Sequence, residues 1–180
     1  MRNLKWFARP DKFKNRLIMV ILGVLIQGFG LSWIIEVSFG TDPCSAFTQG
    51  VISHVPLSFG TAQLLINIIL FVVVFFADTG LIGFGTIANM VFIGYISDFC
   101  RFIYSKTLPA ELFQNTTTRI IILIPALIVF IFGAAMYMTA GLGTSPYDAI
   151  AFIVSERAEN IPFKFIRMSW DIIFLLLGWI

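Results

Sequence analysis

Two short segments of this 180-residue chain carry the same order of small, hydroxyl, polar and proline residues, and they are the strongest candidates for a binding function. The first is Gly40-Thr41-Asp42-Pro43, and the second is Gly143-Thr144-Ser145-Pro146 followed closely by Asp148. In each segment the third residue is a good helix N-cap and the proline suits the first helical position. Because a helix N-terminus has unpaired N–H groups and a partial positive charge, two such ends can bind an anion or a carbonyl-rich solute. The alternative is that these residues only cap short helices, which need caps with or without a ligand.

A second set of candidates consists of polar side chains inside long apolar segments. The set is Gln27, Glu36, Gln63, Asn67, Asn89, Asp98, Arg167 and Asp171. Polar groups in hydrocarbon usually face the interior of a helix bundle, where they find partners. Arg167 and Asp171 are four residues apart and can pair on one helix face. We predict that Asn67, Asn89 and Asp171 contact a solute, against the alternative that they only join helices by hydrogen bonds.

The residues that usually perform catalysis or bind metals are not arranged for either role. Cys44 and Cys100 lie 56 positions apart and His54 is the only histidine, so neither a disulfide framework nor a histidine-rich metal site is predicted. The chain has no nucleophile elbow and no phosphate-binding loop. We therefore expect no catalytic residues, no metal site, no cofactor and no enzymatic activity.

The elements that must position these residues are membrane-spanning helices. The chain is 58% hydrophobic and only 12% charged, whereas a soluble domain is about 25% charged. At about 1.5 Å per residue, each of five apolar segments can cross about 30 Å of hydrocarbon with modest tilt or some buried flanking residues. These segments are 17–37, 61–77, 81–103, 120–140 and the stretch from 162 onward. Two shorter helices, at 41–55 and 144–158, follow the first and fourth segments.

The order of these elements predicts an internal repeat. A shift of 103 positions aligns 29–51 with 132–154, and seven of the 23 positions are identical. We therefore expect an all-α polytopic membrane protein made of two homologous halves. Each half has a long transmembrane helix, a short broken or re-entrant helix and two further transmembrane helices, with the second half truncated at its end.

The boundaries of this prediction follow from charge and hydropathy. Residues 1–16 form a basic arm, 17–103 the first repeat, 104–118 a connecting loop and 119–180 the incomplete second repeat, which lacks its last transmembrane helix. The natural chain is expected to continue for roughly 25–35 residues, the length of one more span and its loop.

Six of the twelve basic residues precede the first span, which places the N-terminus in the cytoplasm. A nucleic-acid partner is not expected, because the basic cluster adjoins a hydrophobic segment. If the short helices do not cross the membrane, the halves have inverted topology; if they do cross, the halves are parallel. Helix length favours the first topology, and the basic residues Arg101, Lys106 and Arg119 favour the second.

Four motifs follow one another along the chain: Gly40-Thr41-Asp42-Pro43, residues 57–62, Gly83-Phe84-Gly85-Thr86 with Asn89 and Gly94, and residues 140–146 with Asp148. In their order and spacing the chain resembles the YczE/YyaS/YitT group of bacterial membrane proteins. The resemblance implies a bacterial plasma membrane location, and it supplies neither catalytic residues nor a substrate. The chain departs from the pattern at Ile166 and Arg167, where the repeat suggests Gly-Thr.

The function that fits these features best is a permease or carrier for a small solute, with the two Gly-Thr-x-Pro segments meeting near the middle of the membrane. The rival is a non-transporting scaffold or regulatory subunit that binds another membrane protein. A substrate-capturing subunit of a larger transporter lies between the two. The expected partners are the lipid bilayer, a small solute, and a second copy or another membrane protein.

Overall fold

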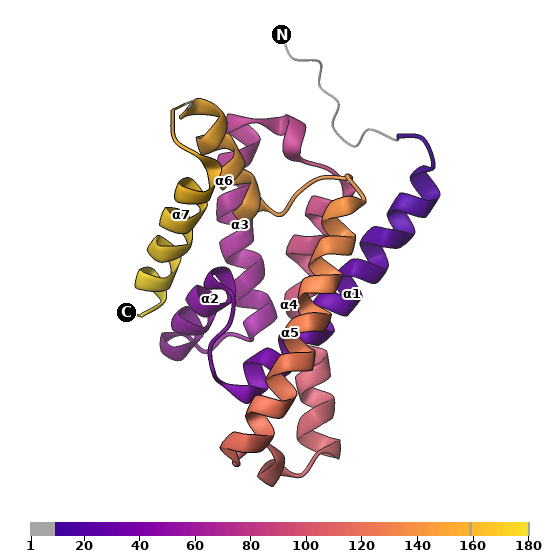
Figure 1. Cartoon of the computed structure of the whole chain (residues 1–180), viewed down its shortest axis with the longest axis vertical. Coiled ribbons are helices and arrows are strands. Elements are labelled where there is room, and N and C mark those ends of the chain that lie inside the picture. Colours follow the sequence, from indigo (N-terminus) through magenta and orange to yellow (C-terminus); the bar gives the residue numbers. More distant parts are fainter. Residues whose placement is uncertain (1–9, 159, 180) are drawn as a thin grey trace.

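The computed structural model describes residues 10–158 and 160–179, so most of the basic arm lies outside the described residues. The described part of the chain is all-helical, as predicted (Figure 1). Its α-helices are α1 (Phe13–Val37), α2 (Pro43–His54), α3 (Phe59–Ala77), α4 (Phe84–Thr107), α5 (Thr116–Thr139), α6 (Pro146–Arg157) and α7 (Phe163–Gly178). Two short 3-10 helices, η1 (Thr79–Leu81) and η2 (Ala110–Phe113), lie in the connections.

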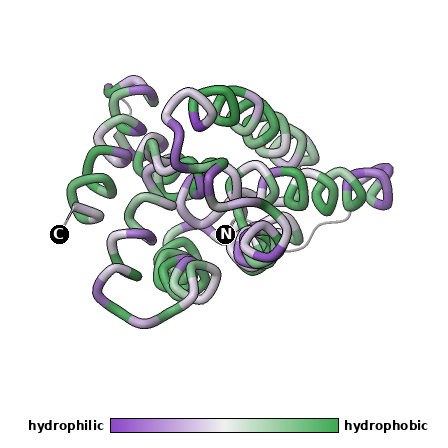
Figure 2. The backbone as a smooth tube through the Cα atoms, turned by 90° about the horizontal axis from the view of Figure 1, so that it is seen from below, coloured by the Kyte–Doolittle hydropathy of each residue, from purple (hydrophilic) through white to green (hydrophobic). Residues whose placement is uncertain are grey.

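Four of these helices, α1, α3, α4 and α5, are long and apolar enough to cross a membrane. Hydrophobic residues cover most of their length (Figure 2). The fifth predicted span, α7, has 16 residues in the structure and is shorter than the other four. The chain is thus a multi-pass membrane protein. α1 begins at Phe13 rather than at 17, because Lys14 and Arg16 favour helix and form its polar first turn.

The two short helices lie at opposite ends of α3 and α7 (Figure 1). α1 and α3 run in opposite directions with α2 between them, and α5 and α7 run in opposite directions with α6 between them (Figure 1). Each short helix therefore returns the chain to the side from which it came. α1 and α5 lie side by side and run in opposite directions (Figure 1).

Two separate hydrophobic clusters divide the helices into two groups. The first group, α2, α3, α6 and α7, packs around a cluster that includes Ile66, Val74, Ile150 and Phe174. The second group, α1, α4 and α5, packs around a cluster that includes Val24, Leu31 and Tyr137, and Phe59 at the start of α3 also belongs to this cluster. The groups meet where α3 packs against α4, and a Cβ added to Gly60 would lie 2.8 Å from the backbone nitrogen of Tyr95.

Small residues bring α1 and α5 into backbone contact, as they commonly do between membrane helices. A Cβ added to Gly30 would lie 2.6 Å from the nitrogen of Phe130. A Cβ added to Gly133 would lie 2.5 Å from the nitrogen of Gln27. These distances leave no room for a larger side chain, so the two helices form a tightly packed pair.

Candidate functional site

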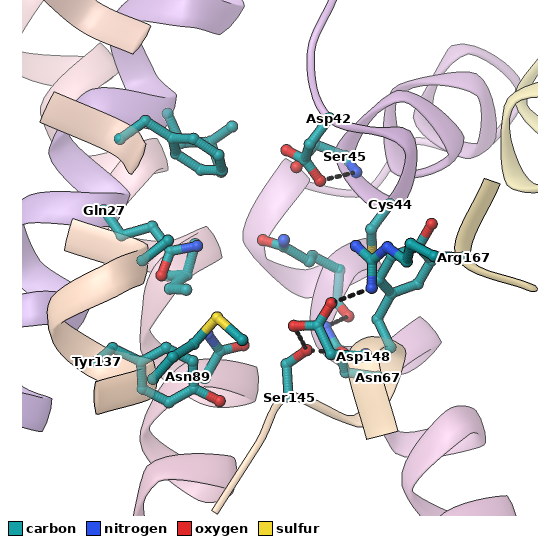
Figure 3. A pocket seen from close by; sticks show the side chains of 17 residues that line it. Gln27, Asp42, Cys44, Ser45, Asn67, Asn89, Tyr137, Ser145, Asp148 and Arg167 are labelled. Carbon is teal, nitrogen blue, oxygen red and sulfur yellow. Dashed lines mark hydrogen bonds and ion pairs between the residues drawn. The ribbon is translucent and has the colours of Figure 1, made fainter. Parts of the chain in front are cut away.

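A polar cavity of about 200 Å³ lies between the two helix groups. Its wall on one side includes Gln27 and Tyr137, and the opposite wall includes Asp42, Asp148 and Arg167 (Figure 3). Every α-helix described contributes to the lining, with α1 and α5 supplying one wall and α2, α6 and α7 the other. The full lining is Gln27, Leu31, Asp42, Cys44, Ser45, Gln63, Asn67, Asn89, Ile93, Phe130, Ala134, Tyr137, Met138, Ser145, Tyr147, Asp148 and Arg167.

Both predicted N-caps are formed. The Asp42 carboxylate accepts a hydrogen bond from the backbone nitrogen of Ser45 at 3.1 Å and caps α2. The Ser145 hydroxyl accepts from the backbone nitrogen of Asp148 at 3.1 Å and caps α6, and it also donates to the Asp148 carboxylate at 2.6 Å. Each cap thus occupies a backbone donor and brings a carboxylate to its helix N-terminus. The caps therefore weaken the expectation that these ends bind an anion.

The glycines before the caps have nearly the same backbone conformation. Gly40 has φ +106° and Gly143 has φ +105°, a region that side chains rarely adopt. Gly40 lies in open space, whereas a Cβ added to Gly143 would meet the backbone of Gly83 at 2.6 Å. We call the turns before α2 (residues 40–43) and α6 (residues 143–146) the first and second corners. The second corner, which contains Gly143, is therefore the more constrained of the two.

Backbone hydrogen bonds fix the second corner to the start of α4. The nitrogen of Thr144 donates to the carbonyl of Leu81 at 3.1 Å, and the nitrogen of Gly85 donates to the carbonyl of Leu142 at 2.7 Å. The hydroxyl of Thr86 accepts from the nitrogen of Gly83 at 3.0 Å. The Gly83–Thr86 motif thus holds the corner that carries Ser145 and Asp148.

Arg167 joins α6 and α7 on one side of the cavity. Its guanidinium pairs with the Asp148 carboxylate on α6 and, at 3.2 Å, with Asp171 one turn further along α7. It also lies 4.9 Å from the centre of the Tyr147 ring, and the Tyr147 hydroxyl donates to Asp171 at 2.5 Å. The predicted pairing of Arg167 with Asp171 is present. The bond from Arg167 to Asp148 ties α7 to the N-terminus of α6.

Unpaired polar atoms gather at the cavity. In the described part of the chain, five buried side-chain oxygens lack a hydrogen-bond partner within the protein. Four of them belong to cavity-lining residues: Gln27 Oε1, Asp42 Oδ1, Gln63 Oε1 and the Tyr137 hydroxyl. A buried polar group without a partner costs about 1–3 kcal/mol. The residues that line the cavity therefore have hydrogen-bonding capacity that the described protein does not use.

The structure brings five of the twelve predicted site residues into the cavity wall: Asp42, Asn67, Asn89, Ser145 and Asp148. Asp171 lies behind that wall and contacts it through Tyr147 and Arg167. The other six form the two corners: Gly40, Thr41, Pro43, Gly143, Thr144 and Pro146.

Asn67 and Asp171, two of the predicted solute contacts, are both engaged within the protein. Asp171 binds Tyr147 and Arg167. The Asn67 side chain donates to the Gln63 carbonyl of its own helix at 2.9 Å. Thr41 also serves its corner rather than the cavity, because its hydroxyl accepts from the Gln49 amide at 3.1 Å.

Sequence reasoning did not select Cys44, Ser45, Tyr137 or Tyr147, although all four line the cavity. It placed Gln27, Gln63 and Arg167 among the polar residues of the spans without assigning them to the site. Asp148 and Arg167 lie 19 positions apart on different helices, so their spacing carries no signal of pairing. The only available signal was the presence of amides and an arginine within hydrophobic stretches.

Comparison with known proteins gives one family match and two relatives, one of them a membrane protein. A model of a family of unknown function, DUF6198, matches residues 14–180. The chain belongs to the DUF6198 family. It is 28% identical over 159 residues to the uncharacterized membrane protein YczE of Bacillus subtilis, covering 87% of this chain and 70% of that protein. An uncharacterized protein of Haemophilus influenzae is 25% identical to this chain over 163 residues, which cover 90% of this chain and 71% of that protein. No solved structure matches this DUF6198 chain.

These matches support the YczE part of the resemblance noted in the sequence. This DUF6198 chain is therefore a multi-pass membrane protein homologous to a bacterial membrane protein.

Proposed function

We propose that this protein is a carrier that moves a small solute across the plasma membrane through the cavity between its two helix groups. The observation that supports this most strongly is the set of unpaired buried oxygens around an interior cavity in a membrane protein. A chain that served only as a scaffold would have no use for such groups, since polar atoms within the bilayer are costly unless they have a role.

We further propose that the carrier consists of two related halves around a pseudo-twofold axis in the membrane plane. Two arginines support this. The Arg16 guanidinium donates to the carbonyl of Ala140 at 3.0 Å, and the Arg119 guanidinium donates to the carbonyl of Val37 at 2.6 Å. Arg16 and Arg119 are 103 positions apart, as are Val37 and Ala140. The two contacts are thus the same contact made by each half on the other.

The crossing of α1 and α5 supports the same axis. Gly30 packs on the backbone of Phe130, and Gly133 packs on the backbone of Gln27. These pairs are also related by 103 positions. α2 contacts α7 and α3 contacts α6, which are equivalent contacts under the same exchange of halves. Inverted repeats that meet at a central site are typical of secondary transporters.

The proposed movement is a rocking of one helix group against the other. Most of each group packs around its own hydrophobic cluster, and the cavity lies between them. The contacts of α3 with α4, and of Phe59 with the second cluster, would adjust during this movement. α2 and α6 lie at opposite ends of α3 and α7 (Figure 1). Separation of the groups at one end or the other would open the cavity to one side of the membrane at a time.

We propose that the N-terminus is cytoplasmic, which places the loop between α4 and α5 outside. Two of the three basic residues near that loop, Arg101 and Arg119, have structural roles that explain their presence there. Arg101 pairs with Glu36 at 2.7 Å, and Arg119 binds carbonyls at the end of α1. A cation at a helix C-terminus is favourable on either side of a membrane.

Purified protein in proteoliposomes should increase the uptake of at least one class of small solute over protein-free vesicles. We would test cationic, neutral and anionic compounds and measure vesicle contents by mass spectrometry. Ala134→Trp, which fills the cavity from α5, should abolish the uptake. Ile128→Trp, on the exposed face of the same helix, should leave it unchanged.

The absence of uptake of all three classes would contradict the carrier and favour the rival, a scaffold or regulatory partner of another membrane protein. Equal uptake by the two tryptophan variants would show that solute does not pass through this cavity.

A further inference from the structure

We infer that the solute held in this cavity carries a positive charge, as a small ammonium compound does, and that the free oxygen of Asp42 contacts it. This inference rests on the proposed carrier function and adds the chemical class of its substrate. It follows from the balance of charge at the cavity, from the polar groups left unpaired there, and from its size.

The charged groups at the cavity are unevenly paired. Among the described residues that line it, Asp42 and Asp148 are acidic and Arg167 is basic. Arg167 already pairs with Asp148 and with Asp171 behind the wall. The Asp42 carboxylate uses one oxygen to cap α2, and its other oxygen, Oδ1, is buried without a partner. A cationic solute would supply the positively charged partner that this carboxylate lacks.

Two of the three unpaired neutral groups at the cavity are oxygens that suit a hydrogen-bond donor, and the third, the Tyr137 hydroxyl, can accept as well as donate. Gln27 on α1 and Gln63 on α3 each have a side-chain oxygen with no partner in the described protein, and Gln63 is only 8% exposed. An ammonium group has donors and no acceptor, so it can bind a carboxylate and amide oxygens together. A charge-assisted hydrogen bond is about twice as strong as a neutral one.

An anion fits the same cavity less well. The helix N-termini that would attract it are already capped by Asp42 and Ser145, and Asp148 lies at the second N-terminus. Arg167, the basic residue of the wall, would have to leave two carboxylates to bind it.

The size of the cavity limits the solute. Its volume of about 200 Å³ is equivalent to about six or seven water molecules in the liquid. Pockets for drug-sized ligands are larger, about 300–1,000 Å³. A compact ammonium compound fits this volume, whereas a nucleotide or a peptide does not.

The charge preference of the cavity can be measured at Cys44, which lines it. In a Cys100→Ser background Cys44 is the only thiol. It would be treated with two methanethiosulfonates of the same chain length, one bearing trimethylammonium and one bearing sulfonate. After each rate is divided by the rate with a free thiol in solution, we expect the cationic reagent to react about tenfold faster.

Asp42→Asn should remove most of that preference, because it removes the charge while an asparagine still caps α2. Glu111→Gln, which removes the same charge from the exposed η2 segment, should retain it. The same comparison at Ala134→Cys, in a chain lacking both native cysteines, places the thiol on the opposite wall and should give the same order of rates.

The outcomes separate this inference from the carrier proposal. Reaction with both reagents at similar relative rates, or faster with the sulfonate, would overturn the cationic class and leave the carrier intact. A cationic preference that survives Asp42→Asn would overturn the role of Asp42. No reaction at either thiol would mean that the cavity is closed to water, which contradicts the carrier itself.

Discussion

Arg167→Gln is expected to lower the apparent unfolding midpoint of the detergent-solubilised protein by about 6–12 °C. The substitution leaves Asp148 and Asp171 without their shared cation and removes the contact with the Tyr147 ring. The side chains of Arg167, Asp148 and Asp171 are 30%, 21% and 28% exposed, so the loss should fall at or below the lower end of the range of about 3–5 kcal/mol for a fully buried pair. For a chain of this size, 1 kcal/mol corresponds to about 2–4 °C. Tryptophan fluorescence during heating would give the midpoint.

Arg101→Gln is the matched control for this substitution. Arg101 has a similar exposed fraction, 32%, but among the described residues its side chain pairs with a single carboxylate, that of Glu36. Its loss should cost about 1 kcal/mol or less, as for a partly exposed pair. The double variant Arg167→Gln/Asp148→Asn should recover part of the stability, because one of the two unpaired charges is gone. Equal losses at Arg167 and Arg101, with no recovery in the double variant, would contradict a structural role for the Arg167 network.

Gly143→Ala is expected to destabilise the protein about twice as much as Gly40→Ala. Both glycines have φ near +105°, so an alanine at either position is strained by about 1–3 kcal/mol. Only at Gly143 would the added Cβ also meet other atoms, at 2.5 Å from the Thr86 hydroxyl and 2.6 Å from the Gly83 nitrogen. Overpacking of this kind costs about 1–3 kcal/mol more.

The comparison isolates the packing of the second corner, since the backbone strain is the same in both variants. The fraction of protein that stays monodisperse after heating in detergent would measure it. Equal losses for the two alanines would contradict the close docking of the Gly143 corner against the start of α4.

The sequence predicts those features that depend on local chemistry. The long apolar runs locate α1, α3, α4 and α5, because a helix that crosses a bilayer must be apolar over about 20 residues. The dipeptides Asp42-Pro43 and Ser145-Pro146 locate the starts of α2 and α6, because a cap and a proline at the first helical position act within one turn.

The cavity depends on which helices lie opposite one another, and this is set by packing across the whole chain. Glycines at 23, 30 and 133 predict close approach but do not name the partner helix. The pairing of Arg167 with Asp148, and the position of Gln27 across from Asp42, follow only when α1, α2, α6 and α7 are in place (Figure 3). Whether the chain crosses the membrane at the short helices or turns back there also could not be read from the sequence, because helix length favoured one topology and the basic residues favoured the other.

The central claim is that the cavity opens to each side of the membrane in turn, and two-sided labelling of Ala134→Cys tests it most directly. The variant would be made without Cys44 and Cys100, and right-side-out and inverted vesicles would be treated with an impermeant thiol reagent. A cysteine at Lys106, in the segment that leads to the α4–α5 loop, serves as the control and should react only in right-side-out vesicles. The account predicts that Ala134→Cys reacts in both preparations. Reaction in only one preparation, or in neither, would contradict alternating access and with it the carrier.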